Sequence, residues 1–506
     1  MTSRPEVDRA SPIADPAQGA ADRGVPAGPR HRSDASPVRG PVARFVLRHR
    51  LFGAVLLAGA VVRVLALLGF RGSLWTTDST RYIQGAVQLA PSPVRTSGYS
   101  VMLWLLGPLH SLTAVVAVQH LMGLAIGVIG YALLRRAGLP GWGATAAMAP
   151  VLLSAYAVQL EHFIMSDTLF ALLIMIAMAL VLWWPVPPVW ACALAGLLLA
   201  AAGLARSEGI PLLVVFLAFL VIRSIGWGTA LRVLVMSAAF VIPVAGYAAW
   251  YDQAFGTFAL TSSSGAFLYG GAATFADCGK FKPPPPEAQL CLNVPVNERK
   301  WSDYYIWHGP LSKFPGGPFG PRADRLGKSF ALQAIRAQPL DYARTVGTYL
   351  WKDFLPPPSL HSRDLTEHNR ARHLNEFMFP AGASKQAPPP TVRIFSQYDP
   401  SGPGARAVQP YAGWIRSYQR YIIVPGPLVA AIVLAGLGGL IVAWRRFGGP
   451  ALLPWLVGAC LLLAPAVIAE SYPRYLVGDI PPLCLAAALG VQQIAAAVRR
   501  SRARPD

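Results

Sequence analysis

Long apolar segments alternate with short polar connections along most of the chain. An α-helix needs about 20 apolar residues to cross the hydrocarbon core of a bilayer. By that rule the pattern predicts ten spans, at residues 46–69, 112–134, 141–159, 164–184, 188–205, 210–225, 230–250, 424–443, 450–469 and 476–497. A further apolar patch at 98–109 is too short to span and contains Trp104, which predicts a helix lying along the membrane surface. The predicted fold class is an all-α polytopic membrane protein.

The arginines assign a side of the membrane to each connection. Arg44, Arg48 and Arg50 precede the first span and place the N-terminus in the cytoplasm, because cytoplasmic connections are enriched in Lys and Arg. Every second connection is then cytoplasmic, and all of these except residues 185–188 have arginine within or beside them. These arginines are Arg135, Arg136, Arg223, Arg232, Arg445, Arg446, Arg499, Arg500, Arg502 and Arg504. The prediction is a multi-pass protein of the plasma (inner) membrane with both termini cytoplasmic.

The other connections face outward in this topology and hold nearly all the acidic residues that follow the N-terminal tail. They are residues 71–111, 160–163, 206–209, 251–423 and 470–474. The cytoplasmic connections are short and carry little besides arginine. Any chemistry is therefore expected at the outer membrane surface.

Five regions follow from this division of the chain. They are a disordered cytoplasmic tail (1–43), an N-terminal membrane domain of seven spans (44–251), a mixed extracytoplasmic region (252–423), a C-terminal membrane domain of three spans (424–498) and a short cytoplasmic tail (499–506). The extracytoplasmic region is too long to lack structure of its own. Within it, Pro339 separates two predicted amphipathic helices. Cys278 and Cys291 also lie there, and a disulfide between them is chemically permitted outside the cell; two unrelated thiols are the alternative.

The composition fits this picture and excludes some functions. Only 13% of the 506 residues are charged and 54% are hydrophobic, whereas a soluble protein carries about a quarter charged residues. The net charge of +20 does not indicate a nucleic-acid partner, because the arginines cluster in the tails and at span ends. Membrane lipids are the expected partners of these arginines. Metal-site spacings of Cys and His are absent from the sequence.

Asp78 is the first candidate catalytic residue. It follows the first span in the stretch WTTDSTRYIQG, together with Arg81. Burial under an apolar surface would raise the pKa of this carboxyl toward the range of a general base. The alternative is a capping role at a helix start, for which Asp-Ser-Thr is also suited.

A second pair of acids, Glu161 and Asp167, stands at the outer end of the fourth span. An acid inside an apolar segment is costly unless it faces a cavity or a partner, so either residue is a candidate for the site. A helix cap formed by Ser166 or Asp167 is the alternative. Arg63 lies inside the first span and needs an internal partner for the same reason.

Arginines in the outer connections are candidate phosphate ligands. Arg206 has Glu208 nearby, and Arg474 with Tyr475 directly precedes the last span. The forked guanidinium group suits phosphate oxygens, and the phosphates at a membrane surface belong to lipids. The alternative is an arginine that extends its charged group toward the surface beside a local acid.

Taken together, these stretches resemble the GT-C glycosyltransferases, and among them the lipid-carrier-dependent group of protein O-mannosyltransferases and aminoarabinose transferases. The resemblance lies in the order and sidedness of six stretches and covers nearly the whole chain after the N-terminal tail. The stretches are TDSTRYIQGA, RTSGYSVMLWLL, MSDTLF, GLARSEG, AIRAQPLDYA and SYPRYLVGDIPPL. Many protein mannosyltransferases have an acidic pair in the first loop, whereas Ser79 follows Asp78 here, so protein as acceptor and mannose as sugar stay open.

The resemblance implies a hexosyl- or pentosyltransferase that moves a sugar from a polyprenyl-phosphate carrier to an extracytoplasmic glycan, lipid or protein, with inversion. It implies Asp78 as the catalytic base and Asp167 or Glu161 as the second catalytic acid. Arg474, Tyr475, Arg206, Arg81 and Arg95 are the implied ligands of the lipid phosphate. Neither a cofactor nor a divalent metal is expected, since the lipid-linked sugar is itself the substrate.

Three other classes remain as alternatives. A transporter or flippase of lipid-linked glycans would place broken or charged helices at the middle of the membrane in paired halves. A ligase or polymerase of whole glycans would share the lipid phosphate but need a larger acceptor groove. A non-catalytic membrane protein would have no use for acids in both early outer loops.

Overall fold

The computed structural model describes residues 41–356, 378–380, 382, 387–446, 449–472 and 474–502. The predicted disorder of the tail at 1–43 therefore falls almost wholly outside the described residues, as do the last four residues of the chain. The chain forms two compact units, residues 1–47 and 48–506. The described part of the first unit is the opening of helix α1 (Pro41–Gly69), and the rest of the described chain belongs to the second unit.

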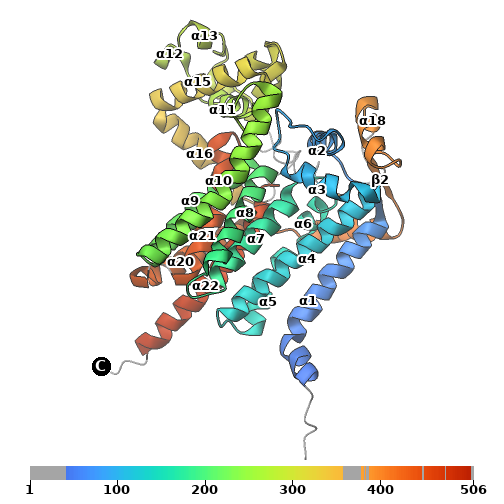
Figure 1. The fold of residues 1–506 in the computed structure, drawn as a ribbon, viewed down its shortest axis with the longest axis vertical. Coiled ribbons are helices and arrows are strands. Elements are labelled where there is room, and N and C mark those ends of the chain that lie inside the picture. Colours follow the sequence, from blue (N-terminus) through green and yellow to red (C-terminus); the bar gives the residue numbers. More distant parts are fainter. Residues whose placement is uncertain are drawn as a thin grey trace, which may run out of the picture. The chain divides into compact units, whose positions relative to one another are not determined.

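All ten predicted spans contain helices. They are α1, α4 (Leu112–Arg136), α5 (Gly141–Leu153) with α6 (Ala155–Leu160), α7 (Asp167–Leu182), α8 (Val189–Ala205), α9 (Leu212–Arg223), α10 (Trp227–Phe255), α20 (Gly426–Val442), α21 (Leu452–Ile468) and α22 (Leu476–Arg502). Several of them contact one another in a bundle, in which α8 packs against both α7 and α10, and α22 packs against α20 and α21 (Figure 1).

The count of ten spans is confirmed only in part. In the described part of the chain, five helices are long and apolar enough to cross a membrane alone, and a sixth is counted if α19 (Tyr411–Tyr421) and α20, bent by 56°, form one span. The third predicted span is broken, because α5 ends at Leu153 and the Ser154 hydroxyl caps the new helix α6. The predicted spans at 164–184, 188–205 and 210–225 form helices of 16, 17 and 12 residues.

A layer of shorter helices lies at one end of the bundle (Figure 1). It contains α11 (Ser264–Ala273), α12 (Cys278–Phe281), α13 (Pro285–Ala288), α14 (Ser302–His308), α15 (Pro321–Ala337) and α16 (Pro339–Asp353). Pro339 begins α16 directly after α15, as the sequence predicted. A disulfide joins Cys278 and Cys291, and α11 packs on α14 and α15 around a core of its own.

The segment between α1 and α2 (Thr77–Gln88) is held from two sides. Strand β1 (Phe70–Ser73) pairs antiparallel with β2 (Gly404–Ala407), more than 300 residues further along the chain. Gly72 has φ +99° and lies against the Gly404 carbonyl, where a side chain would clash. Leu74 then exchanges backbone hydrogen bonds of 3.0 and 3.1 Å with His162 and Ile164. These contacts fix the point at which α2 begins.

The remaining elements at this end are α3 (Gly98–Leu106), a 3-10 turn at Gly107–Leu109 and α18 (Pro389–Tyr398). The helix predicted for residues 98–109 is therefore present, and it leaves Trp104 and Leu105 exposed by 47% and 64%. Both α3 and α18 pack on α2. The described protein is mostly helical, with the two short strands forming its sheet.

Candidate functional site

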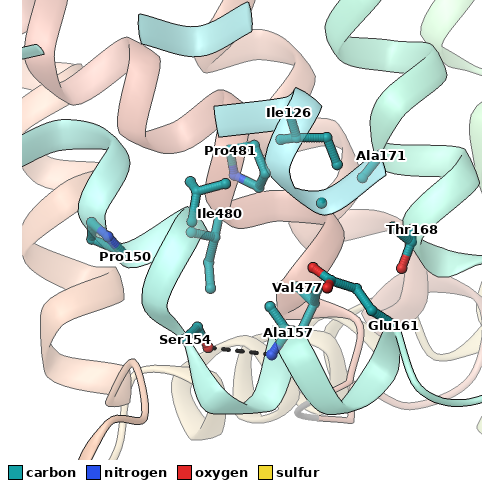
Figure 2. Close-up of a pocket in the computed structure, with 12 residues that line it drawn as sticks. Ile126, Pro150, Ser154, Ala157, Glu161, Thr168, Ala171, Val477, Ile480 and Pro481 are labelled. Atoms are coloured by element: carbon teal, nitrogen blue, oxygen red, sulfur yellow. Dashed lines mark hydrogen bonds between the residues drawn. The ribbon is translucent and has the colours of Figure 1, made fainter. Parts of the chain in front are cut away.

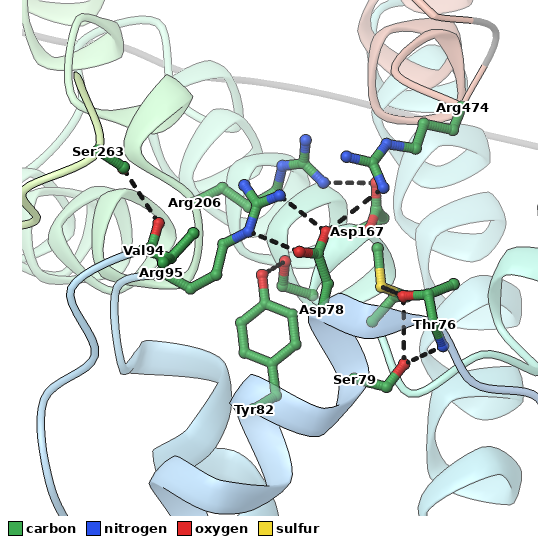
Figure 3. A network of polar contacts seen from close by, with 12 residues as sticks. Thr76, Asp78, Ser79, Tyr82, Val94, Arg95, Asp167, Arg206, Ser263 and Arg474 are labelled. Atoms are coloured by element: carbon green, nitrogen blue, oxygen red, sulfur yellow. Dashed lines mark hydrogen bonds and ion pairs between the residues drawn. The ribbon is translucent and has the colours of Figure 1, made fainter. Parts of the chain in front are cut away.

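Asp78 lies in the first turn of α2, but it is not the residue that caps this helix. The N-cap is Thr76, whose backbone N–H donates to Ser79 Oγ at 2.9 Å. The Asp78 carboxylate instead accepts two hydrogen bonds from Arg95, at 3.1 Å from Nε and 2.8 Å from Nη2. Arg474 Nη1 lies 3.5 Å from Asp78 Oδ2 on the other side (Figure 3). The capping alternative therefore does not describe Asp78.

These two guanidinium groups change the expected acidity of Asp78. Burial alone would raise its pKa, but the charges of Arg95 and Arg474 outweigh burial, and the pKa lies below its ordinary value. The prediction of a raised pKa was therefore wrong. That prediction rested on the apolar surroundings of Asp78 alone. Arg95 and Arg474, 17 and 396 residues further along the chain, bring two positive charges to the carboxylate. Asp78 is ionised throughout the physiological range.

Asp167 and Arg206 form a second ion pair beside the first. Asp167 begins α7, and its Oδ1 accepts a hydrogen bond of 2.5 Å from Arg206 Nη1. Arg206 follows the last residue of α8, binds Glu208 through Nε at 2.8 Å, and lies over the ring of Tyr475 at 5.3 Å. The second carboxylate oxygen of Asp167 is buried without a hydrogen-bond partner in the described structure. The cap position of α7 is held by Ser166, whose side chain makes no capping bond.

Tyrosines connect the two ion pairs. The ring of Tyr475 contacts the guanidinium groups of both Arg206 and Arg474, and its hydroxyl accepts a hydrogen bond of 3.2 Å from Arg474 Nη2. Tyr82 of α2 shares a hydrogen bond of 3.0 Å with Ser166, directly before Asp167 (Figure 3). The first, third and last outer connections of the predicted topology thus meet the outer end of the fourth predicted span in one polar cluster.

A cavity of about 280 Å³ opens beside this cluster. Asp78, Arg95 and Arg474 contribute to its polar side, and Arg81 and Tyr475 also line it. Its other walls come from the start of α2, the loop before α3, the short-helix layer and the α21–α22 connection, namely Thr76, Thr77, Val94, Phe267, Ser302, Asp303, Ile306, Trp307, Phe319, Ala469, Glu470 and Tyr472. Asp167 and Arg206 are not among the lining residues, although Arg206 contacts the ring of Tyr475, which does line the cavity. An anionic group with an attached polar portion fits such a lining.

Glu161 lies elsewhere. Both of its carboxylate oxygens bind Arg63, at 2.6 Å from Nη2 and 2.8 Å from Nε, and Oε2 also lies 2.8 Å from His120 Nδ1. It lines a separate apolar cavity of about 30 Å³ with residues such as Thr168 and Pro481 (Figure 2). Of the two predicted second acids, the structure brings only Asp167 next to Asp78. Arg63 explains the position of Glu161, because a buried arginine in the first span requires a counter-ion.

This buried cluster supports the loop before α7. His120 Nε2 lies 3.3 Å from His162 Nδ1, and the other nitrogen of His162 lies 2.8 Å from the Phe70 carbonyl. Burial, together with the nearby His120, lowers the pKa of His162 to about 3, so this ring is neutral. Gln119 donates to the carbonyls of Glu161 and Phe163, both at 2.8 Å. These buried side chains therefore hold both segments that meet at Leu74, namely strand β1 and residues 161–163.

Glu470 is the residue of the cavity that sequence reasoning left without a role. It follows α21, is only 3% exposed, and accepts a hydrogen bond of 3.1 Å from Tyr472. Burial raises its pKa to about 7. Its position within five residues of Arg474 was the available signal, but the sequence could not show that α14 would cover it. Among the described residues, no group of three or more His, Cys, Asp or Glu side chains is arranged to hold a metal ion.

No family model matches the sequence, and no curated protein matches it either. The fold is similar to solved structures of GT-C membrane glycosyltransferases at low sequence identity. One is the Saccharomyces cerevisiae protein O-mannosyltransferase Pmt1–Pmt2 complex bound to its sugar donor, with 13% identity, 50% of this chain and 38% of that chain covered, and a TM-score of 0.34.

Two further structures cover more of this chain. The Archaeoglobus fulgidus oligosaccharyltransferase tethered to an acceptor peptide has 12% identity and a TM-score of 0.40, with 91% of this chain and 51% of that chain covered. ArnT from Cupriavidus metallidurans in the apo state has 16% identity and a TM-score of 0.32, with 88% of this chain and 78% of that chain covered. This chain thus spans about half or less of the first two proteins. The similarity concerns the fold alone.

Proposed function

We propose that this protein is an inverting glycosyltransferase that moves one sugar from a polyprenyl-phosphate carrier to an acceptor outside the cytoplasm. The observation that carries the proposal is the meeting of Asp78, Arg95 and Arg474 in one cavity. The reaction releases a lipid phosphate, whose charge must be stabilised, and removes a proton from the acceptor hydroxyl. Arginine and carboxylate side chains facing the same space suit both requirements.

The arginines have the positions that phosphate binding needs. Arg95 and Arg474 are partly buried on two sides of the Asp78 carboxylate, and both line the cavity. Arg81 adds a third guanidinium group to the lining. A lipid phosphate could accept hydrogen bonds from these groups while its polyprenyl tail stays in the bilayer. Tyr475 would hold Arg474 in place through their hydrogen bond.

The size of the cavity favours transfer of one sugar. Ligand cavities commonly measure about 300–1,000 Å³, and this cavity has about 280 Å³. That space suits a single sugar phosphate better than the oligosaccharide of a ligase or polymerase. The cavity also lies at one end of the bundle, whereas a transporter binds its substrate near the middle of the membrane.

The location supports a reaction outside the cytoplasm. The disulfide of Cys278 and Cys291 lies in the short-helix layer that forms part of the cavity wall. Disulfides persist in oxidising compartments and are rare in the cytoplasm. The arginine-rich connections lie on the other predicted side, in agreement with the positive-inside rule. The proposed topology therefore keeps ten membrane helices with both termini inside.

Two carboxyl groups can serve as the base. Asp78 is assigned this role because it lies between the two arginines that would hold the donor phosphate, which would place it near the anomeric carbon of a bound donor. Glu470 is the second candidate, because a pKa of about 7 matches the pH at which it would accept a proton. Inversion requires only one base, acting on an acceptor that attacks from the side opposite the leaving phosphate.

The function is tested by reconstituting the protein in lipid vesicles with polyprenyl-phosphate sugars labelled in the sugar. We expect the label to leave one of these carriers when a membrane or cell-wall extract supplies the acceptor, with free polyprenyl phosphate as the second product. A sugar nucleotide should not replace the lipid donor. Transfer from a nucleotide with every lipid donor left intact would contradict the proposal.

The pH dependence of stability tests the environment of Glu470. Its pKa is about 7 in the fold against an ordinary value of 4.5, so the native state binds more protons than the unfolded state between these values. The contribution of Glu470 to the free energy of unfolding should therefore be greatest below about pH 4.5. This contribution should fall by about 3 kcal/mol as the pH rises through 7.

Thermal unfolding in detergent between pH 5 and 8 measures this effect. Glu470→Gln should flatten the curve over that range, since the variant has no proton to lose. Asp341→Asn is the matched control, because Asp341 also lies on the predicted outer side but pairs with Lys280 near the surface. An unchanged slope in Glu470→Gln would show that another group titrates.

A further inference from the structure

A second, larger cavity lies at the end of the bundle opposite the candidate site. It measures about 500 Å³ and is formed where α4, α7 and α9 end, where α10 begins, and along α22. Three arginines line it, namely Arg136, Arg223 and Arg232. The positive-inside rule assigns this end to the cytoplasm. Nothing in the proposed transfer reaction uses this cavity.

Two of the three arginines are oriented by the connection between α7 and α8. Arg136 donates from Nε to the Trp183 carbonyl and lies over the Trp183 ring at 5.0 Å. Arg232 donates from Nε to the Pro187 carbonyl at 2.7 Å. In both cases the bond uses Nε, so the terminal nitrogens stay available for a ligand. The side chain of Arg223, the last residue of α9, makes no hydrogen bond or ion pair with the described part of the chain.

Among the described residues, no acid lines the cavity beside these charges. The sequence also contains no acid from residue 168 to 207, from 209 to 251 or from 400 to 469. Three guanidinium groups around one cavity without a carboxylate repel one another, and a bound anion would relieve this repulsion.

The remaining walls of the cavity are apolar. Leu133, Val181, Phe219, Leu485 and Leu489 line it from four different helices. Trp183 and Trp184 stand at its edge with exposures of 38% and 40%, and tryptophan is enriched at the level of lipid headgroups. Free phosphate cannot pack against apolar walls, whereas an acyl or prenyl chain attached to a phosphate can.

We infer that this cavity binds the phosphate group of an anionic membrane lipid, with the lipid chain lying against its apolar walls. The ligand class is a phosphate ester of net negative charge, and free phosphate is the other source of the same chemistry. Basic cavities between membrane helices on the cytoplasmic side have the chemistry that such headgroups require. The inference is independent of the proposed sugar transfer.

Native mass spectrometry of the delipidated protein in neutral detergent tests this inference, with phosphatidylglycerol, phosphatidylcholine and inorganic phosphate as probes. We expect phosphatidylglycerol to bind more tightly than zwitterionic phosphatidylcholine. Arg223→Ala should weaken phosphatidylglycerol binding about fivefold, and Arg223→Glu about 25-fold, since one basic residue near a lipid headgroup contributes a factor of about five. The triple change of Arg136, Arg223 and Arg232 to Ala should weaken it about 100-fold.

Arg499→Ala is the matched control. Arg499 lies at the same end on α22, bonds only to a carbonyl of its own helix and does not line the cavity, so its variant should bind phosphatidylglycerol as the parent does. Because Arg223 has no partner in the described chain, Arg223→Glu keeps the test open if the triple variant fails to fold. Equal losses in Arg499→Ala and Arg223→Glu, or unchanged binding in Arg223→Glu, would overturn the site. Inorganic phosphate that competes at the same concentration as the lipid would overturn the lipid as its ligand.

Discussion

Asp78→Asn is expected to lower the rate of sugar transfer by about 10³-fold or more while the protein still inserts into the membrane. Loss of a general base alone costs about 10²–10⁴-fold. The change also removes the charge that Arg95 and Arg474 share, so both guanidinium groups should shift relative to the donor phosphate. Initial rates in the vesicle assay, at saturating donor, measure the effect directly.

The same substitution elsewhere provides the control for Asp78→Asn. Asp341→Asn, on α16 and outside the cavity, should leave the rate within about twofold. Asp78→Glu keeps the charge but moves it by one methylene, so it should retain more activity than Asn if the carboxylate acts on the acceptor. Full transfer by Asp78→Asn, together with its loss in Glu470→Gln, would assign the base to Glu470.

Removing one member of the Arg63–Glu161 pair should cost about 3–5 kcal/mol of stability, because the remaining charge would be buried without its partner. Arg63 and Glu161 are 2% and 3% exposed, and two hydrogen bonds join them. We expect both Arg63→Met and Glu161→Gln to lower the unfolding temperature in detergent strongly. Arg50→Ala, on the exposed face of the same helix, should change stability by less than about 0.5 kcal/mol.

The double variant Arg63→Met with Glu161→Gln separates structure from catalysis. Replacing both members of a buried pair is often neutral or stabilising, so the double variant should recover much of the lost stability. If Glu161 only supports the loop before α7, sugar transfer should recover as well. A double variant that is stable but inactive would return Glu161 to the catalytic residues.

The apolar pattern was sufficient to predict where the helices lie, but it could not give their lengths. Each of the ten apolar segments forms a helix because a span must satisfy its backbone hydrogen bonds internally. The breaks arise from local signals that the pattern averages out. Pro150 and Ser154 interrupt the third segment, and Pro188 and Pro211 fix where α8 and α9 begin. Hydropathy therefore located the helices better than it predicted their lengths.

The sequence could predict the side of the membrane on which the candidate site lies, but it could predict only some of the residues that meet there. Counting spans placed Asp78, Asp167, Arg206 and Arg474 on one side, and the structure brings them together. The separation of Glu161 could not be foreseen, because it depends on Arg63 facing the end of α5 and the loop after α6 rather than the cavity. The acidity of Asp78 was likewise set by contacts between distant residues. Such contacts are not encoded in local spacing.

The pairing of β1 with β2 has a consequence for how the protein is made. Residues 70–73 leave the ribosome long before residues 404–407, and Arg474 emerges later still. At about 5–20 residues per second, the first outer loop waits roughly 20–80 s for its partners. The early membrane helices must therefore reside in the bilayer before Asp78 has gained Arg474 as its partner. A nascent chain arrested before α21 and α22 would contain every helix of the N-terminal membrane domain, but its candidate site would not be assembled.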